Sequence, residues 1–112
     1  MKTIKIKEIG IEVTYPKTWT KPYNKIEIPE GWRMIRVLEL FFILDGSKYM
    51  NKFLGKLKGK WNYFWCEQTH CAKRIKASSA LYLECDLDLK LDSWGFKDSI
   101  EGGRVVFCRS LK

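Results

Sequence analysis

The sequence contains a single histidine, His70, and no long apolar run. The longest such run covers residues 40–44, whereas a helix needs about 20 apolar residues to cross a bilayer. The first ten residues alternate Lys with Ile and contain no continuous apolar stretch like that of a signal peptide. We therefore expect a cytoplasmic protein that has no membrane partner.

Motifs that indicate catalysis are also missing. A Cys or Ser nucleophile needs a base that is itself held in place, but His70 lies in a polar stretch that predicts a loop. No glycine-rich phosphate loop is present, since Gly102-Gly103 is typical of a hairpin turn. We predict no catalytic residues, no cofactor and no enzyme activity.

The cysteines, which are Cys66, Cys71, Cys85 and Cys108, lack the spacing of a paired zinc knuckle. Cys66-x-x-x-His70-Cys71 would supply one compact half of a zinc site. Buried thiols and a loop histidine are the simpler interpretation. We therefore predict no metal.

What the chain does have is enough apolar material for one domain and an uneven charge. It has 112 residues, of which 46% are hydrophobic and 14% aromatic, as in a packed single domain. Residues 1–76 hold 16 Lys or Arg against 7 Asp or Glu, whereas residues 77–112 hold 5 against 6. A basic region attracts nucleic acid or an acidic partner. Abundant Lys with little Gln or Asn also indicates a thermophilic source.

Hydrophobic periodicity predicts strands near both ends of the chain and helices between them. The predicted strands cover residues 4–6, 9–15, 25–28, 61–65, 80–91 and 104–109. Helical spacing follows Gly31 and ends at Asp45-Gly46, and a second helix is expected from Ser47 to about residue 56. This order predicts an α+β fold with adjacent N- and C-terminal strands, two helices and a β-rich second half.

The turn between the first strands and the helices carries a family resemblance. Residues 29–33 read Pro-Glu-Gly-Trp-Arg and residues 39–40 read Glu-Leu. They resemble the P-x-G-W-R-L-P-T-x-x-E-L opening of small C-type-lectin-like domains of unknown function. That family is distantly related to the formylglycine-generating (sulfatase-modifying) group. Physically, Gly31 suits a tight turn, Trp32 is expected to fill the core beneath it, and Arg33 can pair with a carboxylate or with chain carbonyls.

The resemblance extends over residues 28–109. Residues 62–67 resemble the aromatic strand of the family and residues 103–109 its terminal strand. Where the family has Leu-Pro-Thr, this chain has Met-Ile-Arg at residues 34–36, so the usual helix-start signal is missing. The resemblance implies a single C-type-lectin-like domain over residues 1–112, of the kind found in crenarchaea and their viruses, which would place a viral copy in the host cytoplasm.

The lectin-like template also places the late strands beside the C-terminal strand. This implies a disulfide between Cys85 and Cys108, since intracellular proteins of hyperthermophiles can carry disulfides. The activity of the sulfatase-modifying enzymes is not implied, because their cysteine pair lies near the end of a much longer chain.

We therefore predict a non-catalytic binding module for a protein or other macromolecular ligand. Lectin-like domains present variable loops on a stable base, and such loops commonly carry function. The candidate binding residues lie in two loops of the second half and are Trp94, Phe96, His70, Lys73 and Arg74. Trp94 and Phe96 could equally belong to the core, and the oligomeric state is left open.

The alternative is a nucleic-acid-binding protein. A basic run is followed by Trp61, Tyr63 and Trp65, and single-strand binders combine cationic tracks with exposed rings. The lysines of this run are Lys48, Lys52, Lys56, Lys58 and Lys60. A solvated helix face and a core strand would produce the same pattern.

Overall fold

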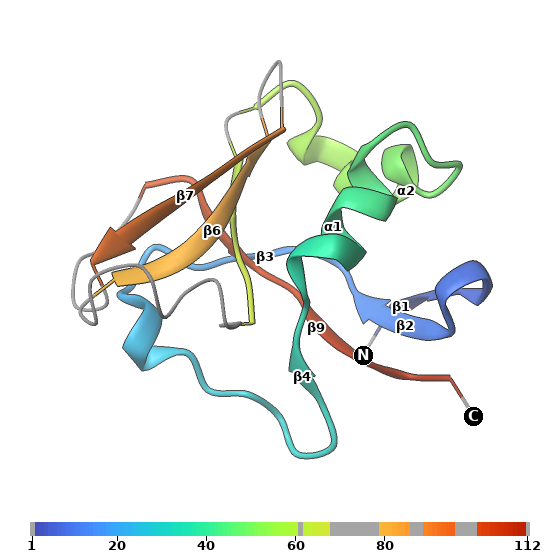
Figure 1. The fold of residues 1–112 in the computed structure, drawn as a ribbon, viewed down its shortest axis with the longest axis horizontal. Coiled ribbons are helices and arrows are strands. Elements are labelled where there is room, and N and C mark those ends of the chain that lie inside the picture. Colours follow the sequence, from blue (N-terminus) through green and yellow to red (C-terminus); the bar gives the residue numbers. More distant parts are fainter. Residues whose placement is uncertain (1, 61, 68–78, 86–88, 96–100, 112) are drawn as a thin grey trace.

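The computed structural model describes residues 2–60, 62–67, 79–85, 89–95 and 101–111; for residues 79–85 and 89–95 it describes the backbone alone. Within these residues the fold is α+β, as predicted, with two sheets and two α-helices (Figure 1). One sheet has the strand order β1 (Thr3–Ile6), β2 (Ile11–Thr14), β9 (Phe107–Ser110) and β4 (Arg33–Met34). The other has the order β3 (Lys17–Thr18), β8 (Gly103–Val105), β5 (Asn62–Trp65), β6 (Ser79–Cys85) and β7 (Leu89–Gly95).

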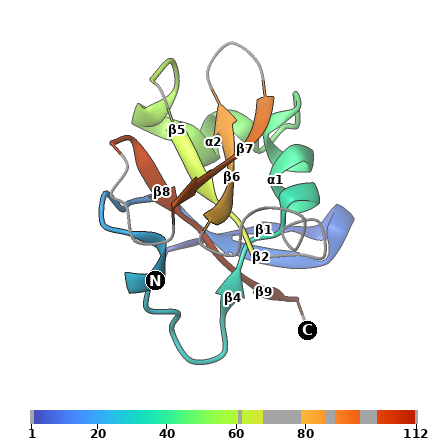
Figure 2. The same cartoon turned by 60° about the vertical axis from the view of Figure 1, so that its left-hand side comes forward.

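Two bent segments belong to both sheets. The first runs from β2 into β3 and the second from β8 into β9, and the two pair antiparallel along their length. Val13 pairs with Cys108 in one sheet and Lys17 with Val105 in the other. Figure 2 shows β8 and β9 as one path that crosses from one sheet to the other. The two sheets are therefore joined through continuous chain.

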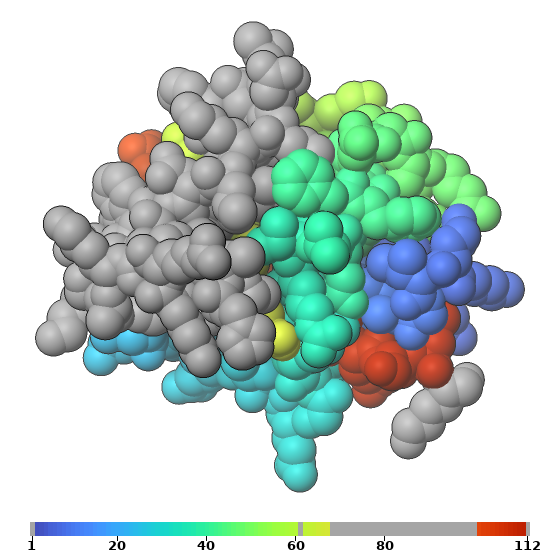
Figure 3. All heavy atoms as spheres, viewed as in Figure 1, coloured from blue at the N-terminus to red at the C-terminus, as the bar shows by residue number. Residues whose placement is uncertain are grey.

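The helices α1 (Val37–Leu44) and α2 (Met50–Leu54) cover the main core. Their buried side chains pack against strands of both sheets, and the ring centroids of Phe53 and Phe64 are 5.9 Å apart. The buried members are Ile4, Ile6, Ile11, Val13, Ile35, Leu40, Ile43, Leu44, Phe53, Leu54, Phe64, Cys66, Val106 and Cys108. Figure 3 shows the N-terminal hairpin and the C-terminal strand lying against each other beside the helices.

The Gly-Trp-Arg turn begins α1 through an ion pair. Gly31 has φ +82°, and the Trp32 backbone N–H donates to the Pro29 carbonyl at 3.1 Å, as in a turn that requires a left-handed residue at its third position. Arg33 donates to both carboxylate oxygens of Glu39 at 2.8 and 2.7 Å and to the Met34 carbonyl at 3.1 Å, so both kinds of partner expected from the sequence are present. The Arg36 backbone N–H donates to the same carboxylate at 2.8 Å. Glu39 therefore satisfies an N-terminal amide of the helix, although the family's Pro and Thr are absent.

One prediction around this turn is wrong, and the helix begins a few residues after the turn. Arg33 and Met34 pair with β9 as β4, so α1 begins only at Val37. Trp32 does not fill the core; it is half-buried, and the Arg109 guanidinium carbon lies 4.2 Å from its ring centroid. Both differences arise because this segment pairs with the C-terminal strand. Such pairing leaves no sign in the helical periodicity of the sequence.

Tertiary contacts also override three predicted element boundaries. Residues 25–28 form no strand: the 3-10 helix Tyr23–Lys25 occurs there, and the Tyr23 ring lies 5.3 Å from the Trp65 ring. The strand predicted over residues 80–91 is an antiparallel pair, β6 and β7, in which Cys85 is opposite Leu89. The strand predicted over residues 104–109 is interrupted at Val106, where the chain passes between sheets.

The second helix and the terminal strands differ from prediction in smaller ways. The Ser47 hydroxyl donates to the Ile43 carbonyl at the end of α1 and accepts a hydrogen bond from the Tyr49 backbone N–H at 3.2 Å, and α2 begins later than expected, at Met50. The first and last strands share a sheet, but β2 lies between them. In the described part of the chain, no helix is long and apolar enough to cross a membrane.

Candidate functional site

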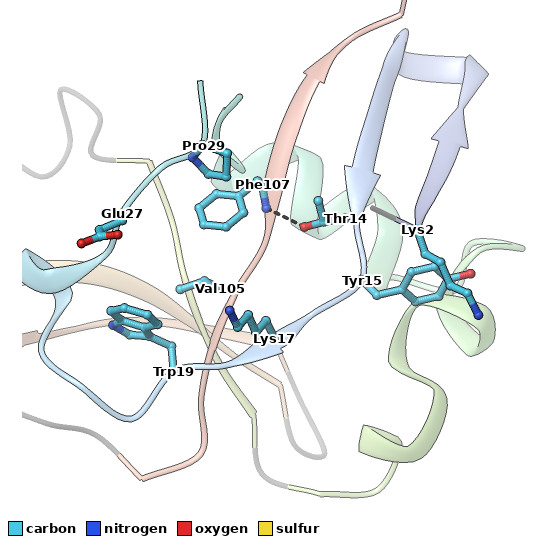
Figure 4. A pocket seen from close by; sticks show the side chains of 9 residues that line it. All are labelled: Lys2, Thr14, Tyr15, Lys17, Trp19, Glu27, Pro29, Val105 and Phe107. Carbon is cyan, nitrogen blue, oxygen red and sulfur yellow. Dashed lines mark hydrogen bonds between the residues drawn. The ribbon is translucent and has the colours of Figure 1, made fainter. Parts of the chain in front are cut away.

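A groove on the outer face of the bent strands is the candidate site. Its volume is about 460 Å³, in the range of small-ligand sites of roughly 300–1,000 Å³. It is lined by Lys2, Thr14, Tyr15, Lys17, Trp19, Glu27, Pro29, Val105 and Phe107. Figure 4 shows Trp19 and Glu27 on one side, Tyr15 and Lys2 on the other, and Phe107, Val105 and Lys17 between them. We call it the Trp19 groove.

Strand alternation produces the floor of the groove. Along β8 and β9, Val106 and Cys108 are fully buried in the main core. Their neighbours Val105 and Phe107 therefore point to the opposite face, where they line the groove. The same period continues on the paired segment, where Tyr15 and Lys17 precede Trp19 at intervals of two residues.

A second, smaller core cluster supports the groove. Met34, Trp65 and Val105 form it, and Trp19 and Phe107 pack against it among partly buried apolar residues. Hydrogen bonds of Trp19 and Phe107 also hold these two residues in place. The Trp19 backbone N–H donates to the Gly103 carbonyl at 2.8 Å and its indole N–H to the Pro22 carbonyl at 3.2 Å.

The Phe107 backbone N–H donates to the Thr14 hydroxyl oxygen at 2.9 Å, which joins the two bent segments at the groove (Figure 4). Trp19 and Phe107 are half-buried, as is Tyr15. Each ring is thus packed in part and exposed in part. Such a surface offers apolar contact without first having to become ordered, which lowers the entropic cost of binding.

The charges around the groove are mostly positive. Lys2 and Lys17 are exposed cations in its lining, and Glu27 is an exposed carboxylate there. Lys21 lies next to the site, with its ammonium nitrogen 5.7 Å from the Trp19 ring centroid. The arrangement can hold an apolar or aromatic body together with an anionic group.

The thiols that the structure describes are poor nucleophiles. Cys66 and Cys108 are both buried. Burial, together with the Glu39 carboxylate 3.8 Å from its sulfur, raises the pKa of Cys108 to about 12. Since the thiolate is the reactive form, Cys108 is unreactive near neutral pH. Within the described residues, no cluster of three or more metal-ligating side chains occurs.

The predicted disulfide rests on the premise that the strand of Cys85 lies beside the C-terminal strand. That premise is wrong, although the bond itself stays a prediction. Cys85 belongs to β6 in the five-stranded sheet, whereas Cys108 belongs to β9 in the four-stranded sheet. They are therefore not neighbours across one sheet. The side chain of Cys85 is outside the described part of the structure.

Most of the predicted binding residues lie outside the described residues, namely Phe96, His70, Lys73 and Arg74. Trp94 lies in β7, where its backbone pairs with Ala80 of β6, so its placement in a loop is wrong. The binding role of these residues stays a prediction. The sequence analysis does not predict the groove, because its strand over residues 9–15 ends before Pro16. The alternation of Tyr15, Lys17 and Trp19 past Pro16 is the signal that indicates it.

The lysines of the basic run are all exposed, around α2 and the turn after it. Lys48 lies 3.6 Å from Glu8, and the Lys58 ammonium donates to Asn51 at 2.8 Å. Trp65 is fully buried and Tyr63 half-buried, while Trp61 is outside the described residues. Trp65 is therefore not accessible as a ring on which a base could stack beside these lysines.

Comparisons of the chain with models of protein families, with curated proteins and with solved structures find no match. The groove must therefore be interpreted from its own residues. Its half-buried rings and its cations come from segments that are distant in sequence, between Lys2 and Phe107.

Proposed function

We propose that the protein is a non-catalytic binding module and that its ligand occupies the Trp19 groove. The observation that carries this proposal is the set of three half-buried rings, Tyr15, Trp19 and Phe107, beside the cations Lys2 and Lys17. Exposed aromatic faces next to charged groups are typical of recognition sites. The ligand can be a protein segment or another macromolecule that presents an apolar group near a negative charge.

We further propose a C-type-lectin-like domain as the scaffold. Three observations support it: the α+β class, the pairing of the N-terminal hairpin with β9, and the Gly-Trp-Arg turn. In addition, Arg33 of the motif pairs with Glu39, which is the Glu of its later Glu-Leu. An origin in thermophilic archaea or their viruses rests on this resemblance and on the composition.

A binding role is favoured over catalysis by the state of Cys66 and Cys108, the two thiols that the structure describes. Cys108 has a strongly raised pKa, and Cys66 is fully buried. Glu39, which lies beside Cys108, already accepts hydrogen bonds from Arg33 and from the Arg36 backbone. None of these groups is therefore available to begin a reaction.

The proposal is tested by mapping where small anionic aromatic compounds bind. Benzoate and indole-3-acetate are titrated into isotope-labelled protein and followed by amide chemical shifts, with acetate as the control without a ring. We expect saturable shifts at Thr14, Lys17, Trp19 and Phe107 in the millimolar range, about −4 kcal/mol. Acetate is expected to leave these amides unshifted.

Shifts scattered over the surface, or equal shifts with acetate, would contradict the proposal. The protein with Lys17→Gln provides a matched test, because Lys17 is exposed and its replacement should leave the fold intact. In that variant the same amides should respond with a several-fold weaker dissociation constant. An unchanged constant would mean that the groove does not recognise the anionic group.

A further inference from the structure

The rings of the Trp19 groove suit stacking better than insertion. Tyr15, Trp19 and Phe107 come from two paired segments and line one groove, and each remains partly exposed. Trp19 and Phe107 are packed on one side against the second core cluster. Flat ligands can therefore lie on the exposed side of these rings. Nucleobases are flat, and stacking of a base on an aromatic side chain contributes about 1–3 kcal/mol.

The same groove carries cations on the side chains that alternate with the rings. Lys17 lies between Tyr15 and Trp19 in sequence, and Figure 4 shows it at the centre of the groove with Lys2 beside Tyr15. Lys21 approaches the Trp19 ring. The whole chain has a net charge of +8. Phosphates that follow a run of stacked bases would find these ammonium groups alongside the rings.

The exposed lysines around α2 provide a useful contrast. They supply positive charge, but Trp65, which follows them, is fully buried. The Trp19 groove instead combines both parts of a single-strand binding surface: exposed rings and exposed cations. A polyanion that lacked bases would use the charge of either surface and would gain nothing from the rings.

We infer that the Trp19 groove binds single-stranded nucleic acid, with bases stacked on Trp19, Phe107 and Tyr15 and phosphates near Lys2 and Lys17. This inference rests on the proposed function of the groove and assigns its ligand class. Glu27 lies in the same lining as a carboxylate. Glu27 repels phosphate, so the phosphate backbone of the nucleic acid follows the side of the groove that carries Lys2 and Lys17.

The main experiment measures binding of a labelled oligothymidylate of about 12 nucleotides, within the site sizes of single-strand binders, by fluorescence anisotropy. Two double variants are compared with the unsubstituted protein. Lys2→Gln with Lys17→Gln removes two groove cations, and Lys52→Gln with Lys56→Gln removes two cations around α2. Both pairs change the net charge equally, and all four lysines are exposed, so folding should be unaffected.

Binding by the unsubstituted protein should weaken at least about tenfold between 50 and 200 mM salt if a few phosphates are contacted. The groove variant should bind about tenfold more weakly than the unsubstituted protein at low salt, and its salt dependence should be shallower. The α2 variant should change less than about twofold, through the long-range field alone. Equal losses in both variants, a larger loss in the α2 variant, or no binding at low salt would overturn the inference.

Glu27→Gln provides a test with the opposite sign. Removing this carboxylate should tighten oligonucleotide binding a few-fold, whereas Glu30→Gln, a neighbouring exposed carboxylate outside the lining, should have a smaller effect. Equal effects of the two substitutions would indicate attraction by net charge without binding in the groove, and would count against the inference.

Competition separates stacking from charge alone. Polyphosphate and poly-glutamate carry negative charge without bases, so they should displace the oligonucleotide much less effectively than unlabelled oligothymidylate at equal charge. If poly-glutamate competed as well, the ligand would be an acidic peptide and the nucleic-acid assignment would fall. If benzoate shifts the groove amides but oligonucleotides do not bind, the groove remains a ligand site and only its assigned ligand class is wrong.

Discussion

The side chains on the two faces of the segment β8–β9 differ in burial. On one face, Val106 and Cys108 are fully buried among the residues of the main core, under the two helices. On the other, Val105 covers a smaller cluster, and Phe107 remains half-exposed in the Trp19 groove. One strand thus supplies both a filled core and an open ligand surface. The first face holds the segment in position, so the second can leave the Phe107 ring partly exposed at little cost in stability.

The largest expected effect is the loss of stability when a side chain of the main core is truncated. Phe53→Ala should lower the free energy of unfolding by about 3–5 kcal/mol, because it removes a ring that is 1% exposed and packed against Phe64. Leu38→Ala on the neighbouring helix is the matched control and should change little, since Leu38 is 81% exposed. Denaturant titration measures both; similar losses in the two variants would break the comparison.

A second, intermediate effect concerns the polar contacts that hold β8 in place. Asn62 is buried; its amide nitrogen donates to the Leu57 and Lys60 carbonyls, both at 3.0 Å. Its oxygen accepts from the Arg104 side chain at 3.1 Å. Asn62→Leu leaves the buried Arg104 side chain and the two part-buried carbonyls without this partner and should cost about 2–3 kcal/mol of unfolding free energy.

Asn51→Leu is the control for this substitution, because Asn51 is exposed and its oxygen accepts a hydrogen bond from Lys58. It should change stability by less than about 0.5 kcal/mol. Thermal and denaturant unfolding of both variants provides the measurement. A neutral Asn62→Leu would mean that the buried network does not fix β8, and hence that the floor of the groove is held by apolar packing alone.

The smallest of these effects depends on pH. Burial of the Glu39 carboxyl opposes its ionisation, but hydrogen bonds from Arg33 and from the Arg36 backbone outweigh burial and lower its pKa. Because the folded-state pKa is the lower one, its contribution to stability is present above the ordinary range of a glutamic acid. That contribution is lost as the pH falls through the ordinary pKa toward the folded one.

Glu39→Gln should therefore cost about 1–2 kcal/mol at neutral pH and should flatten the decline of stability in acid. Denaturant titrations at neutral and acidic pH test this, with Glu30→Gln as the exposed control. If the variant lost stability in acid as steeply as the unsubstituted protein, other carboxyl groups would account for the decline, and the ion pair would not hold α1 against the filled face.

Sequence patterns predicted the elements whose contacts are local. The break between the first two strands, the end of α1 before Gly46 and the left-handed Gly31 follow from alternation and from backbone preferences, and the structure contains all three. Patterns failed where a distant strand decides the outcome. Arg33 and Met34 pair with β9, and Val106 interrupts the last strand where the chain changes sheet. Such pairing leaves little trace in local periodicity.

The candidate site escaped prediction for a related reason. Its lining joins Lys2, the segment around Trp19 and the strand that contains Phe107, so no single window of sequence contains it. Pro16 hid the continuing alternation, because proline usually interrupts a strand. It is tolerated here at the bend between β2 and β3, where the chain passes from one sheet to the other. Of the loops favoured by the sequence, the segment around Trp94 is part of strand β7, whereas Phe96, His70, Lys73 and Arg74 lie outside the described residues.

The register between β2 and β9 has a consequence for how the protein is made. Val13 is paired with Cys108 and Glu12 with Arg109, so a ribosome must release residues 107–110 before the N-terminal hairpin gains this neighbour. Until then β2 has an uncovered edge, which other nascent chains could join. The four-stranded sheet is therefore expected to assemble only after residues 107–110 have emerged, and closure of so long a loop is expected to be slow.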